Sequence, residues 1–340
     1  MKTFVLISGI FLSNLAFASS WQPLPDKAPA PEDNPTTAEK VELGKMLYFD
    51  PRFSSTGTIS CNSCHNVMAG GDDQRPTSMG VHGKVGGRNA PTVWNSAFHS
   101  VQFWDGRANT LEDQAKGPVT NPIEMGMQDL EIAMQRVKAI PGYATYFEKA
   151  FGKDSMTIDN AAKAVGAFER TLITPNSAYD RYAKGDKNAM SEQQIRGMNT
   201  FASFGCTACH SGPAFNGPSM PLGQGFFTKF PTFADSDYVK KYDLMADSGR
   251  YEVTKSESDK YNFRVQTLRN ITDTAPYFHN GSVSSLHEAV RVMAKTQLNK
   301  TLKDGEVDDI VAFLGALTGE YPTLTMPRLP ATPGTTLLAK

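Results

Sequence analysis

Two copies of the motif Cys-x-x-Cys-His constrain this chain more than any other feature. They span Cys61–His65 and Cys206–His210, and together they contain all four cysteines of the 340 residues. Two thiols about one helical turn apart can each add to one vinyl group of the same haem, and the adjacent histidine then lies beneath the iron. The motifs therefore predict two covalently attached c-type haems. The attachment residues are Cys61, Cys64, Cys206 and Cys209, and the iron ligands are His65 and His210.

Four cysteines could serve other chemistry. In an exported chain they could form two disulfides, and two Cys-x-x-Cys pairs could hold one tetrahedral zinc ion. A zinc site would leave the histidine after each cysteine pair without a role. Haem attachment uses all four cysteines and both histidines. We therefore favour haem, which a Soret band in the visible spectrum would distinguish from zinc.

The N-terminus has the pattern of an export signal. Met1 and Lys2 precede an apolar stretch from Phe4 to Leu15, and Ala16–Ala18 has the A-x-A form of a cleavage site. The apolar stretch is shorter than the roughly 20 residues that a membrane span needs. We expect a cleaved signal peptide, a mature chain without a membrane span, and a location in the periplasm.

The balance of 34 basic and 35 acidic residues gives a net charge of -1 and argues against a nucleic-acid partner.

The order of the motifs suggests a diverged duplication. Capping-box sequences at Thr36–Glu39 and Ser191–Gln194 precede the two motifs, and helical apolar spacing over 158–172 and 307–317 predicts a closing helix for each unit. We expect a mainly α fold of two cytochrome c-like domains, each with one haem. The expected parts are a signal peptide (1–18), an extended arm (19–35), a first domain (36–174), a junction (175–190), a second domain (191–320) and a tail (321–340).

The second axial ligand of each iron decides what the haem can do. A methionine raises the reduction potential and suits electron transfer, whereas an open or weakly held position permits substrate chemistry. His82 lies in a glycine-rich stretch, 70–87, whose backbone can reposition at little cost. This makes His82 a candidate detachable ligand, with a surface-loop histidine as the alternative. Spacing alone selects no ligand among the 14 methionines.

The chain also resembles the bacterial di-haem cytochrome c peroxidases, from Leu43–Asp50 to the closing helix. The specific runs are Arg88–Thr92, Gln102–Arg107, Gln114–Pro118 and Thr274–Ser282. The resemblance implies an enzyme that reduces hydrogen peroxide with electrons from a small monohaem cytochrome c or a blue-copper protein. It also implies a homodimer.

The same resemblance implies a role for each haem. The haem on His65 would be the low-potential peroxidatic centre, with His82 as the ligand that leaves on activation. The haem on His210 would be the high-potential site of electron entry, with Met293 as its sixth ligand.

Further residues match functional positions of the family. Glu124 and Gln114 match its distal catalytic pair, and Trp104 matches an aromatic residue between the haems. A calcium site would use Asn89, Thr274 and Pro276, the last two through backbone carbonyl oxygens, which suit a hard cation.

Two alternatives remain open at this point. A di-haem electron-transfer cytochrome without turnover would keep both irons six-coordinate. A di-haem oxidase that modifies a tryptophan of a partner protein would carry a tyrosine where this chain has Met293.

Overall fold

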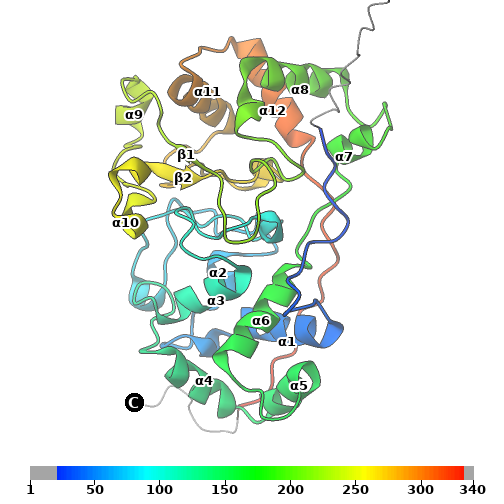
Figure 1. Ribbon diagram of the computed structural model, residues 1–340, viewed down its shortest axis with the longest axis vertical. Helices are drawn as coiled ribbons and strands as arrows, with labels where there is room; N and C mark the ends of the chain where they lie inside the picture. The colour runs from blue at the N-terminus through cyan, green and yellow to red at the C-terminus, as the bar shows by residue number, and fades with distance from the viewer. Residues whose placement is uncertain (1–20, 333–340) are drawn as a thin grey trace, which may run out of the picture.

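The computed structural model describes residues 21–332, so the expected signal peptide and residues 333–340 lie outside the described part. The described chain is mainly helical and forms two bodies (Figure 1). Helices α1 to α6 lie in the lower body of the figure, and α7 to α12 with a short ribbon of two strands lie in the upper one. Within residues 21–332, each helix is too short or too polar to cross a membrane.

The helices of the lower body are α1 (Ala38–Phe49), α2 (Cys61–Cys64), α3 (Leu111–Thr120), α4 (Leu130–Lys138), α5 (Gly142–Phe151) and α6 (Ile158–Glu169). Those of the upper body are α7 (Ala178–Ala183), α8 (Glu192–Phe204), α9 (Asp237–Lys241), α10 (Tyr251–Thr254), α11 (Leu286–Leu298) and α12 (Asp304–Gly315). Strands β1 (Phe227–Lys229) and β2 (Asn262–Arg264) pair in antiparallel fashion.

A pair of closely crossing helices organises each body, α1 with α6 in the lower one and α8 with α12 in the upper one. Both crossings use a glycine. A Cβ atom on Gly44 would lie 1.9 Å from the carbonyl oxygen of Ala164, and one on Gly197 would lie 1.8 Å from that of Asp309. The helix that precedes each Cys-x-x-Cys-His motif thus packs on the helix that closes the same unit, which fits a duplication.

Substitution of Gly44 by alanine tests this crossing. Because the new methyl group would collide with the backbone of α6, we expect the free energy of unfolding to fall by about 1–3 kcal/mol. The matched control is Gly305→Ala in α12, where nothing lies near the added Cβ. There we expect a gain of about 0.5–1 kcal/mol from helix propensity. Denaturant unfolding of the two haem-loaded variants measures both effects, and equal stability would contradict the crossing.

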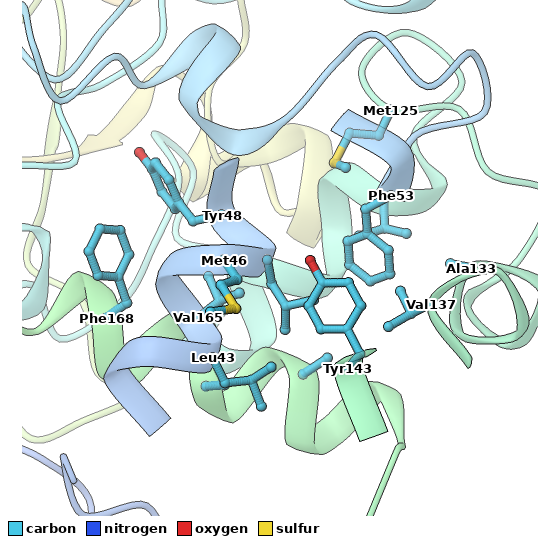
Figure 2. Packing of buried hydrophobic residues seen from close by; sticks show 14 of the residues in the cluster. Leu43, Met46, Tyr48, Phe53, Met125, Ala133, Val137, Tyr143, Val165 and Phe168 are labelled. Carbon is cyan, nitrogen blue, oxygen red and sulfur yellow. The ribbon is translucent and has the colours of Figure 1, made fainter. Parts of the chain in front are cut away.

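Apolar side chains fill each body separately. In the lower body, Leu43 and Tyr48 of α1 meet Tyr143 of α5 and Phe168 of α6 (Figure 2). In the upper body a second cluster brings α8 and α12 together with the segment after the second motif. Its aromatic members are Tyr179, Phe201, Phe215 and Phe313. Burial of each such side chain contributes roughly 1.5–3 kcal/mol.

Local sequence signals predicted several element boundaries. The capping box at Ser191–Gln194 and the two closing helices are confirmed. In the first unit the cap is Thr37 rather than Thr36, because the Thr37 hydroxyl accepts a hydrogen bond from the backbone N–H of Lys40. The two strands were not predicted, since three residues each are too few to show an alternating pattern.

The arm and the tail run along both bodies (Figure 1). Trp21 packs against the aromatic cluster of the upper body, and Asn34 donates a hydrogen bond to Glu112 of α3. Tyr321 packs edge-on against Trp94 with ring centroids 4.9 Å apart. The segment expected as a junction contains α7, whose Tyr179 is buried in the second cluster.

Candidate haem sites

The first motif lines a cavity of about 360 Å³, which we call the first cavity. Cys61 and Cys64 lie at the two ends of the single turn α2, and the backbone N–H of His65 donates to the carbonyl of Cys61. The Tyr48 hydroxyl donates to the His65 carbonyl at 2.6 Å and ties this turn to α1. Cys64 and His65 both line the cavity.

The second motif lines a cavity of about 210 Å³, the second cavity. Cys206 begins a short 3-10 turn, Cys206–Ala208, and the backbone N–H of His210 donates to the Cys206 carbonyl. Apart from the motif, the walls are mostly apolar and come from α8, α11, α12 and the strands. No carboxylate side chain is among the described residues that line this cavity.

The two motif histidines are held in the same way. Nδ1 of His65 lies 2.9 Å from the Pro91 carbonyl oxygen, and Nδ1 of His210 lies 3.1 Å from that of Phe215. Because a carbonyl can only accept, Nδ1 carries the proton and Nε2 is left to bind a metal. Burial lowers the pKa of both imidazoles, which keeps them neutral as iron ligation requires.

The geometry disfavours the zinc and disulfide alternatives. All four cysteines are free thiols; Cys64 lines the first cavity, whereas Cys206 and Cys209 line the second. Within residues 21–332, no group of three or more His, Cys, Asp or Glu side chains could hold a metal ion.

The first cavity also contains the predicted distal pair. Gln114 of α3 and Glu124 of the following loop both line it, 49 and 59 residues after His65 in the chain but in the same space. Asn121, which ends α3, donates to the Glu124 carboxylate at 2.8 Å. Burial raises the pKa of Glu124, while Arg107 and the hydrogen bond from Asn121 oppose the rise. The sequence analysis did not identify Asn121 or Arg107 as partners of Glu124: Asn121 is near it in the chain, but nothing in the sequence marks the pair as lining a cavity, and Arg107 is distant in sequence.

His82 lies outside this cavity. It is exposed on the tight turn Val81–Gly83, with a positive φ of 58°, and it is not among the residues that line the first cavity. Gly80 and Gly83 flank it, and a Cβ on Gly80 would lie 2.0 Å from the Ile123 carbonyl oxygen. The turn therefore contacts the loop of Glu124, and the role of His82 as an iron ligand stays a prediction.

Met293 and Trp104 line cavities that contain the motif histidines, and their roles stay predictions. Met293 of α11 lines the second cavity with His210, and Trp104 lines both cavities. The Trp104 indole N–H donates to the Asn89 carbonyl at 2.8 Å, and its own carbonyl accepts from the backbone N–H of Arg264 at 2.8 Å. Contacts from both bodies thus fix this ring between the cavities.

Polar groups of the second cavity suit the carboxylates of a haem. Arg264 and Gln266 line it, and each has one buried nitrogen, Nη1 and Nε2 respectively, without a hydrogen-bond partner. An unpaired buried donor costs about 1–3 kcal/mol, which an added acceptor would offset. The residues present therefore fit an anionic cofactor.

The predicted calcium residues lie at the junction of the two bodies. The backbone N–H of Asn89 donates to the His279 carbonyl at 2.8 Å, which places Asn89 against the segment 274–279. Thr274 is buried, and Pro276 follows a cis peptide bond in the same segment. The Asn89 side-chain nitrogen donates to the Arg75 carbonyl. Its side-chain oxygen accepts no hydrogen bond from the described residues, and amide and carbonyl oxygens are ligands that calcium accepts.

Comparisons with known proteins agree with this geometry. Residues 38–188 match the family model described as di-haem cytochrome c peroxidase. The chain is 44% identical to a cytochrome c551 peroxidase of Nitrosomonas europaea, over 95% of this chain and 92% of that protein. It is 43% identical to a cytochrome c551 peroxidase of Pseudomonas aeruginosa, over 93% and 89% of the two chains. The crystal structure of a MauG-like protein associated with microbial copper homeostasis superimposes with a TM-score of 0.75 at 28% identity, over 87% of this chain and 95% of that one.

The chain belongs to the di-haem cytochrome c peroxidase family. It is a peroxidase, an oxidoreductase whose family implies two c-type haems, and the expected mainly α, cytochrome c-like fold is confirmed.

Proposed function

We propose that this protein reduces hydrogen peroxide to water at the haem of the first cavity, using electrons that enter at the haem of the second. The observation that carries the proposal is the asymmetry of the two cavities. A carboxylate and an amide, Glu124 and Gln114, line the first, whereas the second is mostly apolar and contains Met293. Proton transfer to peroxide needs an acid–base group such as the carboxylate of the first cavity. The apolar lining and the thioether of the second cavity suit electron transfer.

Cys61, Cys64 and His65 would hold the first haem, whose iron supplies the redox chemistry that cleaves the O–O bond. Glu124 accepts a proton from one peroxide oxygen and donates it to the other, which then leaves as water. Burial raises the pKa of this carboxyl, which moves it toward the working pH, where a general acid–base is most effective. Gln114 donates a hydrogen bond that orients the peroxide.

Cys206, Cys209, His210 and Met293 would hold the second haem. A thioether ligand raises its potential and makes it the better first acceptor of an electron. Trp104, which lines both cavities, lies on the path between them. As the proposed detachable ligand, His82 would have to move inward from its exposed turn to bind the iron of the first haem.

The electron donor that we propose is a small periplasmic redox protein, either a monohaem cytochrome c or a blue-copper protein. The signal-like residues 1–18 support the periplasmic location. We further propose a homodimer and one calcium ion held by Asn89, Thr274 and Pro276. Met293 favours a peroxidase over a di-haem oxidase, which would have tyrosine there.

A stoichiometric assay tests the proposed reaction. Reduction of one peroxide to two waters takes two electrons and two protons, so two reduced one-electron donor proteins should be oxidised for each peroxide consumed. The assay would follow the absorbance of a reduced monohaem cytochrome c without oxygen. Donor oxidation without peroxide consumption would instead indicate a pure electron carrier.

A further inference from the structure

Glu169 is a second carboxyl group in the first cavity. It is the last residue of α6, it lines the cavity, and only 6% of its surface is exposed. Its carboxylate accepts no hydrogen bond from any side chain or backbone group within residues 21–332. A buried carboxylate without a hydrogen-bond partner is costly to ionise, so burial favours its protonated form and makes it sensitive to a nearby change of charge.

No charged side chain within residues 21–332 donates a hydrogen bond to Glu169. Its neighbour Arg170 donates through Nη2 to the Glu112 carboxylate of α3 at 2.7 Å, and its buried Nη1 has no hydrogen-bond partner within those residues. Tyr48 of α1 packs against Phe168 (Figure 2). Its hydroxyl donates a hydrogen bond to the His65 carbonyl rather than to Glu169. Burial raises the pKa of Glu169 to about 8, with Arg170 lowering it and Glu112 raising it.

Glu169 and the first motif affect each other electrostatically. The charge of Glu169 is the largest cause, after burial, of the raised pKa values of both Cys61 and Tyr48. Thioether formation would remove the ionisable thiol of Cys61, and a haem held by this motif would share the cavity that Glu169 lines. The protein interior has a low dielectric constant and screens charge poorly. A change of one unit of charge on the haem would therefore strongly change the energy of an ionised Glu169.

We propose that Glu169 couples proton binding to reduction of the haem attached through Cys61 and Cys64. When one electron arrives from a donor protein, Glu169 binds one proton from solvent, and the charge of the cavity is unchanged. On oxidation it releases that proton. The inference rests on haem attachment at the first motif and not on peroxide reduction there, so it can fail while the proposed function holds.

The direction of the pH effect follows from the sign of the charge. An ionised Glu169 opposes the incoming electron, so the potential of the first haem should fall as pH rises through the range where Glu169 ionises. At most, the equilibrium constant for reduction falls tenfold per pH unit, or about 59 mV for a one-electron couple. The acid–base residue Glu124 shares the cavity, but it has Asn121 as a donor and Arg107 nearby.

Redox titration of the holoenzyme between about pH 5 and about pH 9 tests the proposal, since that range brackets the raised pKa. We expect Glu169→Gln to abolish most of the pH dependence of the first haem and to hold its potential near the acid-limit value. The second haem is an internal control whose titration should not change. Glu148→Gln, an exposed carboxyl in α5, is the matched control and should keep the wild-type slope. A wild-type slope in Glu169→Gln, or a pH-independent wild type, would overturn the proposal.

Infrared difference spectra between the oxidised and reduced protein cover the case in which Glu169→Gln fails to load haem. The wild type should gain a protonated-carboxyl band on reduction, and Glu124→Gln should retain it. Absence of the band from the wild type, or its loss in Glu124→Gln, would refute the role of Glu169.

Discussion

Replacement of Glu124 by glutamine is expected to lower kcat for peroxide reduction by about 10²–10⁴-fold, the usual contribution of a positioned general acid–base. Glutamine preserves the size of the side chain and its hydrogen bond from Asn121, but it cannot carry the proton between the two peroxide oxygens. Both haem spectra should be unchanged. Steady-state assays with a reduced donor protein measure the effect.

The pH profile of the wild type gives a second test of Glu124. Burial raises its pKa, so the carboxylate that accepts the proton is lost as pH falls through that raised value. Activity should therefore decline on the acid side at a higher pH than an ordinary glutamate would give, and this limb should be absent from the residual activity of Glu124→Gln. The matched control is Glu131→Gln on the exposed face of α4, which should retain full turnover. Wild-type turnover in Glu124→Gln would remove Glu124 from the mechanism.

Loss of the second attachment site should have the other large effect. In a variant with both Cys206→Ser and Cys209→Ser, we expect one covalently bound haem per chain instead of two, because each cavity attaches its own haem. Turnover with a protein donor should fall at least about 100-fold, because the second cavity then lacks the haem at which electrons enter. The alkaline pyridine spectrum counts the haems.

The reciprocal variant, with Cys61→Ser and Cys64→Ser, distinguishes the two roles. It should keep the second haem reducible by the donor but lose peroxide reduction. If donor-driven turnover survived in the variant without Cys206 and Cys209, electrons would enter elsewhere. If both variants kept two covalent haems, the attachment sites would be wrong.

Sequence patterns predicted those structural features that depend on residues close together in the chain. The two Cys-x-x-Cys-His motifs, the capping box at Ser191 and the closing helices α6 and α12 each depend on spacings of a few residues. The family resemblance then supplied the roles of Glu124, Gln114 and Met293. Their presence in the cavities agrees with those roles without testing them.

Features that depend on long-range contact could not be predicted in this way. Arg88 of the lower body binds the Asp247 carboxylate of the upper one through two nitrogens, across 159 residues of sequence. In the sequence, Glu169 is indistinguishable from an ordinary carboxylate at the end of a helix. The packing of α6 against α3 shows that it is buried and lines the first cavity. The Asn121 contact to Glu124 is local, but its meaning also depends on the cavity.

Reduction of the oxidised protein by a single electron should distinguish the two haems. The oxidised protein would be reduced by one electron, its haem ligation followed by absorption and electron paramagnetic resonance, and peroxide then added. We predict that the electron resides on the haem held by His210 and Met293, while the haem on His65 gives a high-spin, five-coordinate signal and peroxide is consumed. Two six-coordinate low-spin haems and no peroxide consumption, or an electron that resides on the His65 haem, would contradict the account.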